Sequence, residues 1–292
     1  MKQVSVVIPS FNRGRLLPQI LPTYFQAEVG EVILVDDASA DDTPQVVAEL
    51  QKQYPSLRYV RLPENRRQMY AKNQGIQLAA YPYIYFGDDD SFLTAGSIGT
   101  LLAVMQEKKA DIVGAKALYM DSQEDLQALP AFLKKYEKQA HNAREVVDLT
   151  QLRFNFTLSS EQALRVPVTH ACFLIRTEWA RAILFDEAYR WNAYREETDF
   201  LIRACLAGAV AYYQPAAIQI NLPREMATGG AHSQSKWKWH VACIINNWYF
   251  LNKNYAAMQE QFNLPYSKWM LQLRFVCRGV KKTVERFWGG RR

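Results

Sequence analysis

Three consecutive carboxylates, Asp88, Asp89 and Asp90, give the sharpest chemical signal in this 292-residue sequence. Adjacent carboxylates repel one another, and a bound cation often offsets that cost; hard oxygen ligands suit Mg²⁺ or Mn²⁺. In an extended segment residues i and i+2 point the same way, so we expect Asp88 and Asp90 to share one site and Asp89 to face elsewhere. Such a cation would bridge two phosphates and stabilise the charge on a departing diphosphate. The residues alone equally allow a solvated acidic turn.

A second acidic pair, Asp36 and Asp37, follows the apolar run at residues 31–35. A carboxylate at the end of a buried strand can accept a hydrogen bond from a pyrimidine N–H or a ribose hydroxyl. Taken alone, however, the pair is explained better as a cap of the following turn and helix, a role that Asp and Ser fill routinely.

A third set of acids, Glu196, Glu197 and Asp199, stands at the start of a helical pattern. A hydroxyl that attacks as a nucleophile needs a general base to remove its proton, and a carboxylate at a helix start near a bound substrate can do this. Without that context, a charged helix N-terminus stabilised by the helix dipole is the commoner explanation.

The first 110 residues alternate short apolar runs with helical patterns, which predicts parallel strands joined by helical crossovers. We expect strands at residues 4–8, 31–35, 57–62 and 83–86, and helices at 16–25, after an N-cap at Thr43, and at 69–80. Ligands of such sheets gather beyond the carboxyl ends of the strands. The acids after the second and fourth strands are therefore expected in one crevice.

The pattern loosens after residue 110. Strands are expected at 112–119 and 171–175, a polar, helix-prone insertion at about 121–150, and a helix at 237–251. In the last segment, apolar residues from Trp269 to Phe287 recur at steps of three or four, with bases elsewhere around the wheel. This spacing predicts an amphipathic helix.

These signals occur together and in order, and as an ensemble they resemble the family 2 glycosyltransferases over about the first 210 residues. The matching runs are Val4–Arg13, Val35–Ser39 with Asp42-Thr43, Ala71–Gly75, Gly87–Asp90, Phe185–Glu187 and Glu196–Asp199. The resemblance implies an α/β architecture of the GT-A type, a Rossmann-like, mostly parallel sheet flanked by helices. It also implies a nucleotide-sugar donor, a Mn²⁺ or Mg²⁺ ion, and inversion by single displacement.

On this basis we predict a GT-A catalytic domain at about residues 1–225, with a nucleotide-binding half at 1–110 and an acceptor half at 111–225. A helical C-terminal extension follows at 226–292. The predicted reaction moves a sugar from a nucleotide-diphosphate donor, foremost a UDP-sugar, to a hydroxyl of a glycan or lipid-linked acceptor in polysaccharide or glycoconjugate synthesis.

The family's site residues transfer to positions of this sequence one by one. By resemblance, donor binding falls to the opening loop, the acids after the second strand, the basic position and part of the acidic triplet; these are Pro9, Phe11, Asn12, Arg13, Asp37, Asp36, Lys72, Asp88 and Asp89. Metal binding falls to Asp90 and Asp88, with Asp90 the stronger candidate. Glu197 takes the position of the catalytic base, with Glu196 beside it.

Two of these positions depart from the family's pattern. Glu197 stands where the family has Asp, and the extra methylene changes the reach of the base. Lys72 stands where the family has Arg, and a compact ammonium loses the forked recognition of a guanidinium.

His232 is a further candidate metal ligand, because some related transferases close the metal site with a late histidine. It lies in a glycine-containing loop, Thr228–Ser233. An ordinary surface role is the alternative, since the residue has neither spacing nor motif to mark it.

The basic, aromatic tail from Trp269 to Arg292 allows two interpretations. It can lie on a membrane surface, with Trp288 and the two terminal arginines at lipid headgroups. It can equally pack its apolar stripe onto the catalytic domain and leave its bases outward.

Charge and cysteine content restrict the class of protein. The net charge of +6 comes from the tail: eight bases and one acid follow from Lys268, which leaves 27 bases and 28 acids before it. This argues against a nucleic-acid partner. The four dispersed cysteines suit reduced thiols, no leader is apparent, and the apolar run at 241–251 is shorter than the roughly 20 residues of a membrane span. We therefore predict a cytoplasmic protein, with a peripheral position at the inner membrane face left open.

Two rival functions use the same residues. A nucleotidyltransferase normally needs a glycine-rich basic loop after the first strand, and residues 10–15 contain one glycine. A non-catalytic nucleotide-sugar-binding scaffold of a polysaccharide assembly complex would not need carboxylates at both the metal and the base positions.

Overall fold

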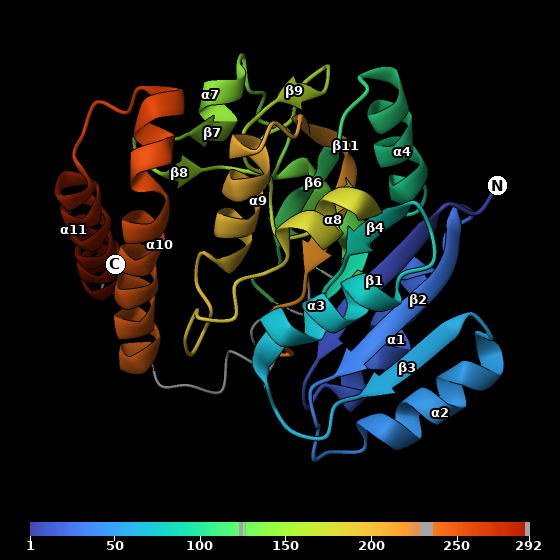
Figure 1. Cartoon of the computed structure of the whole chain (residues 1–292). Coiled ribbons are helices and arrows are strands. Elements are labelled where there is room, and N and C mark those ends of the chain that lie inside the picture. The colour runs from blue at the N-terminus through green and yellow to red at the C-terminus, as the bar shows by residue number, and fades with distance from the viewer. Residues whose placement is uncertain (123–124, 126, 224, 228–235, 290–292) are drawn as a thin grey trace.

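A computed structural model describes residues 1–122, 125, 127–223, 225–227 and 236–289, with the backbone alone at Lys236 and at 280–289. Within these residues one large sheet runs through the molecule in the order β3-β2-β1-β4-β10-β6-β11-β5, and β9 pairs with β11. Helices lie on both faces of this sheet (Figure 1). The predicted α/β fold with a mostly parallel sheet is confirmed.

The N-terminal half of the sheet contains the four parallel strands that the sequence predicts. They are β1 (Val4–Ser10), β2 (Val29–Asp36), β3 (Leu57–Arg61) and β4 (Tyr83–Phe86). The connecting helices are α2 (Thr43–Gln53), which begins at Thr43 itself, and α3 (Arg67–Leu78). The helix expected at 16–25 is instead three short turns, η1 (Gly14–Leu16), α1 (Leu17–Ile20) and η2 (Leu21–Tyr24). Pro18 and Pro22 interrupt it because proline cannot donate a helical hydrogen bond.

The second half of the sheet is mixed. Strand β10 (Phe173–Arg176) lies antiparallel between β4 and β6 (Ile112–Tyr119). Strand β11 (Ala211–Asn221) runs parallel to β6, with a register shift between Gln214 and Ile218, and β5 (Ser91–Leu93) and β9 (Leu164–Arg165) flank it. The sequence did not mark β5 or β11, because Pro215 and alternating polar residues break their apolar pattern.

The predicted insertion contains only short elements. They are α6 (Leu129–Lys134), α7 (Ala143–Val146) and the two-stranded ribbon of β7 (Val147–Asp148) and β8 (Arg153–Phe154). Of these, α7, β7 and β8 lie at the top of the view of Figure 1, between α10 and β9.

Alternate residues of the central strands enter two separate cores, as the two-residue period of a strand requires. On β1, Val6 and Ile8 pack with η1, α1, η2, α2 and α4 (Ser97–Glu107). Val7 on the opposite face packs with α3, α8 (Thr177–Ile183) and α9 (Glu196–Leu206). Because both faces are covered, polar side chains concentrate where the strands end.

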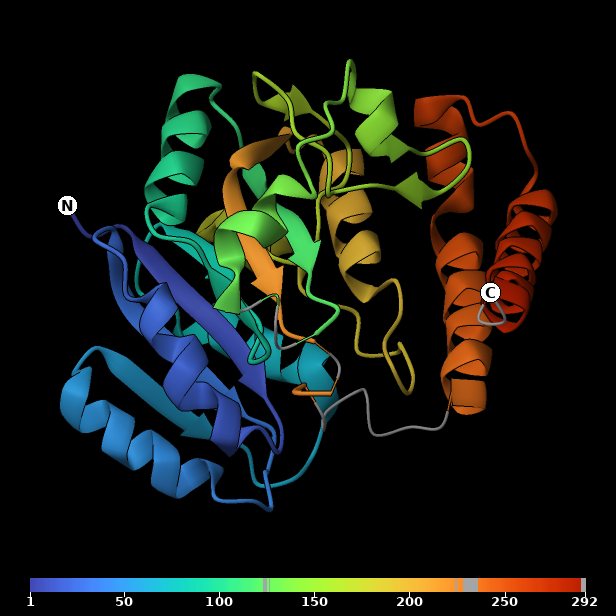
Figure 2. The same ribbon diagram turned by 180° about the vertical axis from the view of Figure 1, so that it is seen from behind.

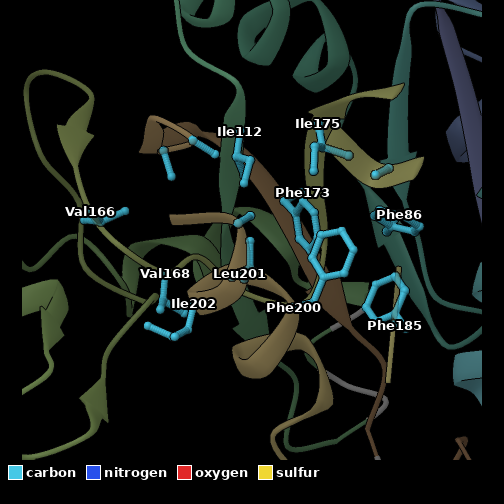
Figure 3. Close-up of a cluster of buried hydrophobic side chains, with 14 of the residues drawn as sticks. Phe86, Ile112, Val166, Val168, Phe173, Ile175, Phe185, Phe200, Leu201 and Ile202 are labelled. Atoms are coloured by element: carbon cyan, nitrogen blue, oxygen red, sulfur yellow. The ribbon is translucent and has the colours of Figure 1, made fainter. Parts of the chain in front are cut away.

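Four phenylalanine rings join the end of β4 to the start of α9 (Figure 3). The ring centroids of Phe86 lie 5.1 Å from those of Phe173 and 5.2 Å from those of Phe185, and Phe185 stacks on Phe200 at 4.4 Å. Phe86 precedes the acidic turn, and Phe200 follows the glutamate pair by one helical turn. This cluster therefore holds the two acidic segments at a fixed separation.

Two C-terminal helices, α10 (Lys236–Phe262) and α11 (Lys268–Gly289), stack beside α9 at one side of the molecule (Figures 1 and 2). Asn247 accepts a hydrogen bond from Arg195 Nε at 3.1 Å, and Asn254 donates to Asp199 Oδ1 at 2.8 Å. Both asparagines are buried. The side-chain amides of these two asparagines thus attach α10 to the start of α9.

Within the described parts of the chain, every helix is too short or too polar to cross a bilayer.

Gly75 lets α3 approach β1. A Cβ built on Gly75 would lie 2.2 Å from Val7 Cγ1. We expect Gly75→Ala to lower the free energy of unfolding by about 1–3 kcal/mol through overpacking. Urea unfolding checks this, with Gly279→Ala in α11 as the control: nothing lies within 4 Å of that Cβ, so the same change should stabilise the helix by about 0.5–1 kcal/mol. Equal effects at the two glycines would contradict this account of α3 packing.

Candidate active site

A cleft of about 540 Å³ opens beyond the carboxyl ends of β1, β2 and β4. Eight of the residues that sequence analysis selected line it, from four separate segments; these are Pro9, Phe11, Arg13, Asp37, Asp88, Asp89, Asp90 and Glu197. The acidic turn and the predicted base thus share one cavity. Asn12, Asp36, Lys72 and Glu196 lie outside its lining, and His232 lies outside the described residues.

Asp89 and Asp90 lie in a turn and not in an extended segment, so the expectation that Asp89 faces elsewhere is wrong, whereas Asp88 and Asp90 line one cleft as expected. Asp89 and Asp90 both approach the guanidinium of Arg13, with Nη1 at 3.8 Å from Asp89 Oδ1 and 3.0 Å from Asp90 Oδ2. Asp88 instead accepts a hydrogen bond from the thiol of Cys172 at 3.2 Å. All three still line the cleft.

Burial and mutual repulsion make this turn electrostatically unfavourable by itself. Burial raises the pKa of Asp88 to about 6, against the attraction of Lys72 and with a further contribution from Asp90. Burial likewise raises the pKa of Asp89 to about 7, against the attraction of Arg13. The carboxylates of the turn therefore outweigh the cation that contacts them, and added positive charge in the cleft would stabilise them.

The loops after β1 and β2 are tied together. Asn12 donates its backbone N–H to Ser39 Oγ at 2.9 Å, and its side chain accepts from Ala40 N at 2.8 Å. Asp36 is fully buried, accepts from Tyr59 Oη at 2.5 Å and from Ser39 N at 2.8 Å, and therefore builds the loop. Neither side chain is placed to contact a ligand in the cleft.

Asp37 lines the cleft and also fixes the start of α3. Its carboxylate accepts the backbone N–H of Arg66 at 2.6 Å and of Arg67 at 2.8 Å. Arg67 has a φ of 72°, a strained value for a side chain of this size. The sequence left ligand binding and capping as alternatives for this residue, and its position is compatible with both.

On the opposite side, Lys72 of α3 meets the two glutamates at the start of α9. Its Nζ lies 2.8 Å from Glu196 Oε1 and 2.9 Å from Glu197 Oε1. Lys72 is 1% exposed and Glu196 is fully buried, whereas Glu197 reaches the cleft. The sequence predicts Lys72 near the donor, but its ammonium lies behind the two glutamates, outside the cleft lining. Helix α3 packs closely on β1 at Gly75, and Lys72, one helical turn earlier, points toward α9.

This contact separates the pKa values of the two glutamates. Burial and the charge of Glu197 raise the pKa of Glu196 well above its usual range. Burial also acts to raise the pKa of Glu197, but the charge of Lys72 and hydrogen bonds from Glu196 and Lys72 outweigh it, so that this pKa is lowered. Glu197 is therefore ionised at neutral pH, as a general base must be.

Several residues of the cleft were missed by sequence analysis. Gln68 is four residues before Lys72 and so on the same helical face, a signal that could have found it. Trp191, 48% exposed, and Asn192 line the rim just before α9. His170 lines the wall with Nε2 at 2.7 Å from Tyr119 Oη, and burial lowers its pKa to about 4. No spacing or motif marks these rim and wall residues.

The sequence profile described as Glycosyl transferase family 2 matches residues 5–184. The chain belongs to this family. The matched residues end before α9, so the family assignment rests on the parallel strands, the acidic turn and β10, and Glu196 and Glu197 lie outside the match.

A curated relative agrees with this assignment. The chain is 35% identical over 118 residues to the GalNAc(5)-diNAcBac-PP-undecaprenol beta-1,3-glucosyltransferase of Campylobacter jejuni, a match that covers 39% of this chain and 38% of that protein. The match thus spans under two fifths of that relative.

Solved structures show the same fold at low sequence identity. S. aureus TarS 1-349 in complex with UDP-GlcNAc has a TM-score of 0.59 and 18% identity, covering 86% of this chain and 67% of that one. GalNAc-T7 with UDP, GalNAc and Mn²⁺ also has a TM-score of 0.59, at 12% identity, covering 91% of this chain and 59% of that one. The GT-A fold of this family 2 glycosyltransferase is thereby confirmed.

Removing Lys72 would leave Glu196 and Glu197 without the cation that both of them contact. We expect Lys72→Met to lower the free energy of unfolding at pH 8 by about 3–5 kcal/mol. Without Lys72 the folded-state pKa of Glu197 rises, and a raised folded-state pKa contributes stability that is lost as pH increases, so the loss should be smaller at pH 5. Urea unfolding at both pH values measures this.

The control is Lys52→Met, which breaks an exposed pair with Glu49 and should change stability by less than about 1 kcal/mol. A loss at Lys72 that does not depend on pH would show that the lysine acts through packing alone.

Proposed function

We propose that this protein transfers a sugar, with inversion, from a nucleotide-diphosphate donor to a hydroxyl of a glycan or lipid-linked acceptor in polysaccharide or glycoconjugate synthesis. One observation carries the proposal: the acidic turn after β4 and Glu197 of α9 line the same cleft. Family membership supports it, as does the lipid-linked substrate in the name of the Campylobacter relative. The UDP-GlcNAc complex of TarS favours a UDP-sugar as the donor.

The residues divide the work of a single displacement. The nucleoside lies along the loops after β1 and β2, near Pro9, Phe11 and Asp37, and its diphosphate lies toward Arg13. Glu197 accepts the proton of the acceptor hydroxyl as its oxygen bonds to the anomeric carbon. The bond from that carbon to the diphosphate breaks at the same time, and the nucleoside diphosphate leaves with the bonding electron pair. Attack from the side opposite the leaving group inverts the anomeric centre.

A divalent ion, Mn²⁺ or Mg²⁺, is part of the proposal. Among the described residues no three His, Cys, Asp or Glu side chains are grouped to hold a metal. Asp88 and Asp90 nevertheless offer hard oxygen donors in the cleft, and such ions commonly take their remaining ligands from substrate phosphates and water. The donor set therefore fits. When bound, the ion would neutralise charge on the leaving diphosphate.

The acceptor is expected on the side of the cleft formed by Trp191, Tyr119 and His170. The exposed indole of Trp191 offers an apolar face at the rim, next to Asn192. The C–H faces of a sugar ring pack well on such a surface, while the amide supplies polar contacts. This arrangement favours a carbohydrate over a small hydrophilic acceptor.

The two rival functions fit the cleft less well. The chemistry of a nucleotidyltransferase does not require an ionised base across the cleft from the acidic turn. A binding scaffold requires neither the base nor the acidic turn. The loop after β1 also presents one buried arginine, Arg13, where a triphosphate would need a glycine-rich cradle.

Replacement of Glu197 tests the proposal. We expect Glu197→Gln to lower the transfer rate by at least about 100-fold, because the amide cannot accept a proton. Donor binding should persist, measured as the thermal shift caused by UDP-GlcNAc with Mn²⁺, because a ligand of the folded state raises its stability. Exposed Glu178 provides the control, and Glu178→Gln should transfer at the wild-type rate. Wild-type transfer by the Glu197 variant would refute the base assignment.

A membrane surface is the second proposed partner. The apolar residues Trp269, Met270 and Leu273 of α11 are 67%, 43% and 56% exposed, so this part of the stripe does not pack on the catalytic domain. Ile244 and Ile245 of α10, whose helix packs against α11, are also exposed. The chain from Lys268 carries a charge of +7. Exposed apolar residues among bases suit an anionic lipid surface, and we propose that the helix pair lies on one.

We expect the double variant Trp269→Ser, Leu273→Ser to lose at least about tenfold in affinity for phosphatidylglycerol vesicles, because it removes apolar area that the lipid surface would bury. Cosedimentation measures this. Trp191→Ser, which removes an exposed tryptophan from the cleft rim, is the control and should bind as the wild type does. Equal binding by all three proteins would show that α11 is not the docking surface.

A further inference from the structure

In the contact between Lys72, Glu196 and Glu197, the lysine and Glu196 are buried and Glu197 reaches the cleft. Glu196 Oε1 accepts from Lys72 Nζ at 2.8 Å and from Gln68 Nε2 at 2.6 Å. Glu196 Oε2 is buried and has no hydrogen-bond partner as an acceptor. Glu197 Oε1 accepts from the same ammonium at 2.9 Å, so the two carboxyl groups converge on one cation. A buried carboxyl oxygen that finds no donor is satisfied when it carries a proton and donates it to a neighbouring acceptor.

The charges around this contact point to the same missing proton. Lys72 balances one negative charge, and if Glu197 is ionised, a second charge on the fully buried Glu196 would remain uncompensated. The other groups that act on it do not help: Asp88 adds negative charge on the side of the acidic turn, and burial keeps His170 neutral. Arg195, the residue directly before Glu196, donates instead to Asn247 and to the carbonyl of Leu152.

We infer that Glu196 is a neutral carboxylic acid in the working protein, which donates its proton from Oε2 to Glu197 and, with Lys72, orients that base. Glu196 is thus a positioning residue. It is neither a second base nor a contact of the donor. Its catalytic part rests on the proposed function, in which Glu197 takes the acceptor's proton.

This role gives each group a distinct task during transfer. Lys72 keeps Glu197 ionised, and the O–H of Glu196 fixes one edge of the Glu197 carboxylate so that the other edge faces the cleft. When Glu197 receives the proton of the acceptor, Glu196 keeps its own. Gln68 is needed on the far side of Glu196, because an amide donor can bond to Oε1 without adding charge.

Adjacent glutamates allow a matched test with the same chemical change. Glutamine has the shape of a protonated glutamate and can donate an N–H in place of the O–H. We expect Glu196→Gln to keep transfer within about threefold of the wild type with an unchanged pH profile, whereas Glu197→Gln loses at least about 100-fold. Glu196→Ala, which removes the donor, should lower kcat by at least about tenfold and leave KM for the donor little changed. A loss in Glu196→Gln as large as that in Glu197→Gln would overturn the proposal.

A stability measurement tests the proton without any transfer. A raised folded-state pKa makes the wild type lose stability as pH rises above the ordinary glutamate value, and glutamine does not titrate. The melting temperature of Glu196→Gln relative to the wild type should therefore increase steadily from pH 5 to pH 8. If it stays constant or decreases, Glu196 is ionised and the inference is wrong. Because this measurement needs no donor, it remains decisive even if the protein transfers no sugar.

Discussion

The active cleft depends on a lysine that has no contact with water. Lys72 comes from a helix packed on β1, and the two glutamates that it contacts begin a helix of the other half of the sheet. The enclosed ammonium brings these halves together and sets the charge of the group that faces the cleft. The phenylalanine cluster around Phe86 and Phe200 supplies the apolar packing that keeps water out of the same region. Apolar burial and one ion contact thus jointly fix the distance between the acidic turn and Glu197.

The parallel half of the fold was predictable because its signals are local. A short run rich in β-branched or aromatic residues between turn residues identifies a strand, and four such runs with intervening helices give the sheet order little freedom. The chemistry at the strand ends followed from the same rule, and Asp37, Asp88, Asp90 and Glu197 do line one cleft. Asp90 and Glu197 are distant in sequence, and it was the ordered set of motifs that indicated their proximity.

What the sequence did not predict depends on direction and on pairing across long separations. A helical pattern does not reveal which neighbour a side chain will meet, so Lys72 was assigned to the donor although it contacts α9. The turn at Asp89 brings its carboxylate to Arg13 beside that of Asp90, and a pattern of residue types carries no information about such a turn. Trp191 and His170 lie in the cleft only because irregular segments pass its rim, and β11 is recognisable only once β6 is in place beside it.

The enclosure of Glu196 and the exposure of Trp191 divide the cleft into two regions under different constraint. A change at Lys72 or Glu196 alters a buried charge balance that solvent does not reach. A change at the rim meets only water and whatever rests there. A substitution in the inner group therefore disturbs the charge of the group that faces the cleft, whereas one at the rim changes only the surface that an acceptor would meet.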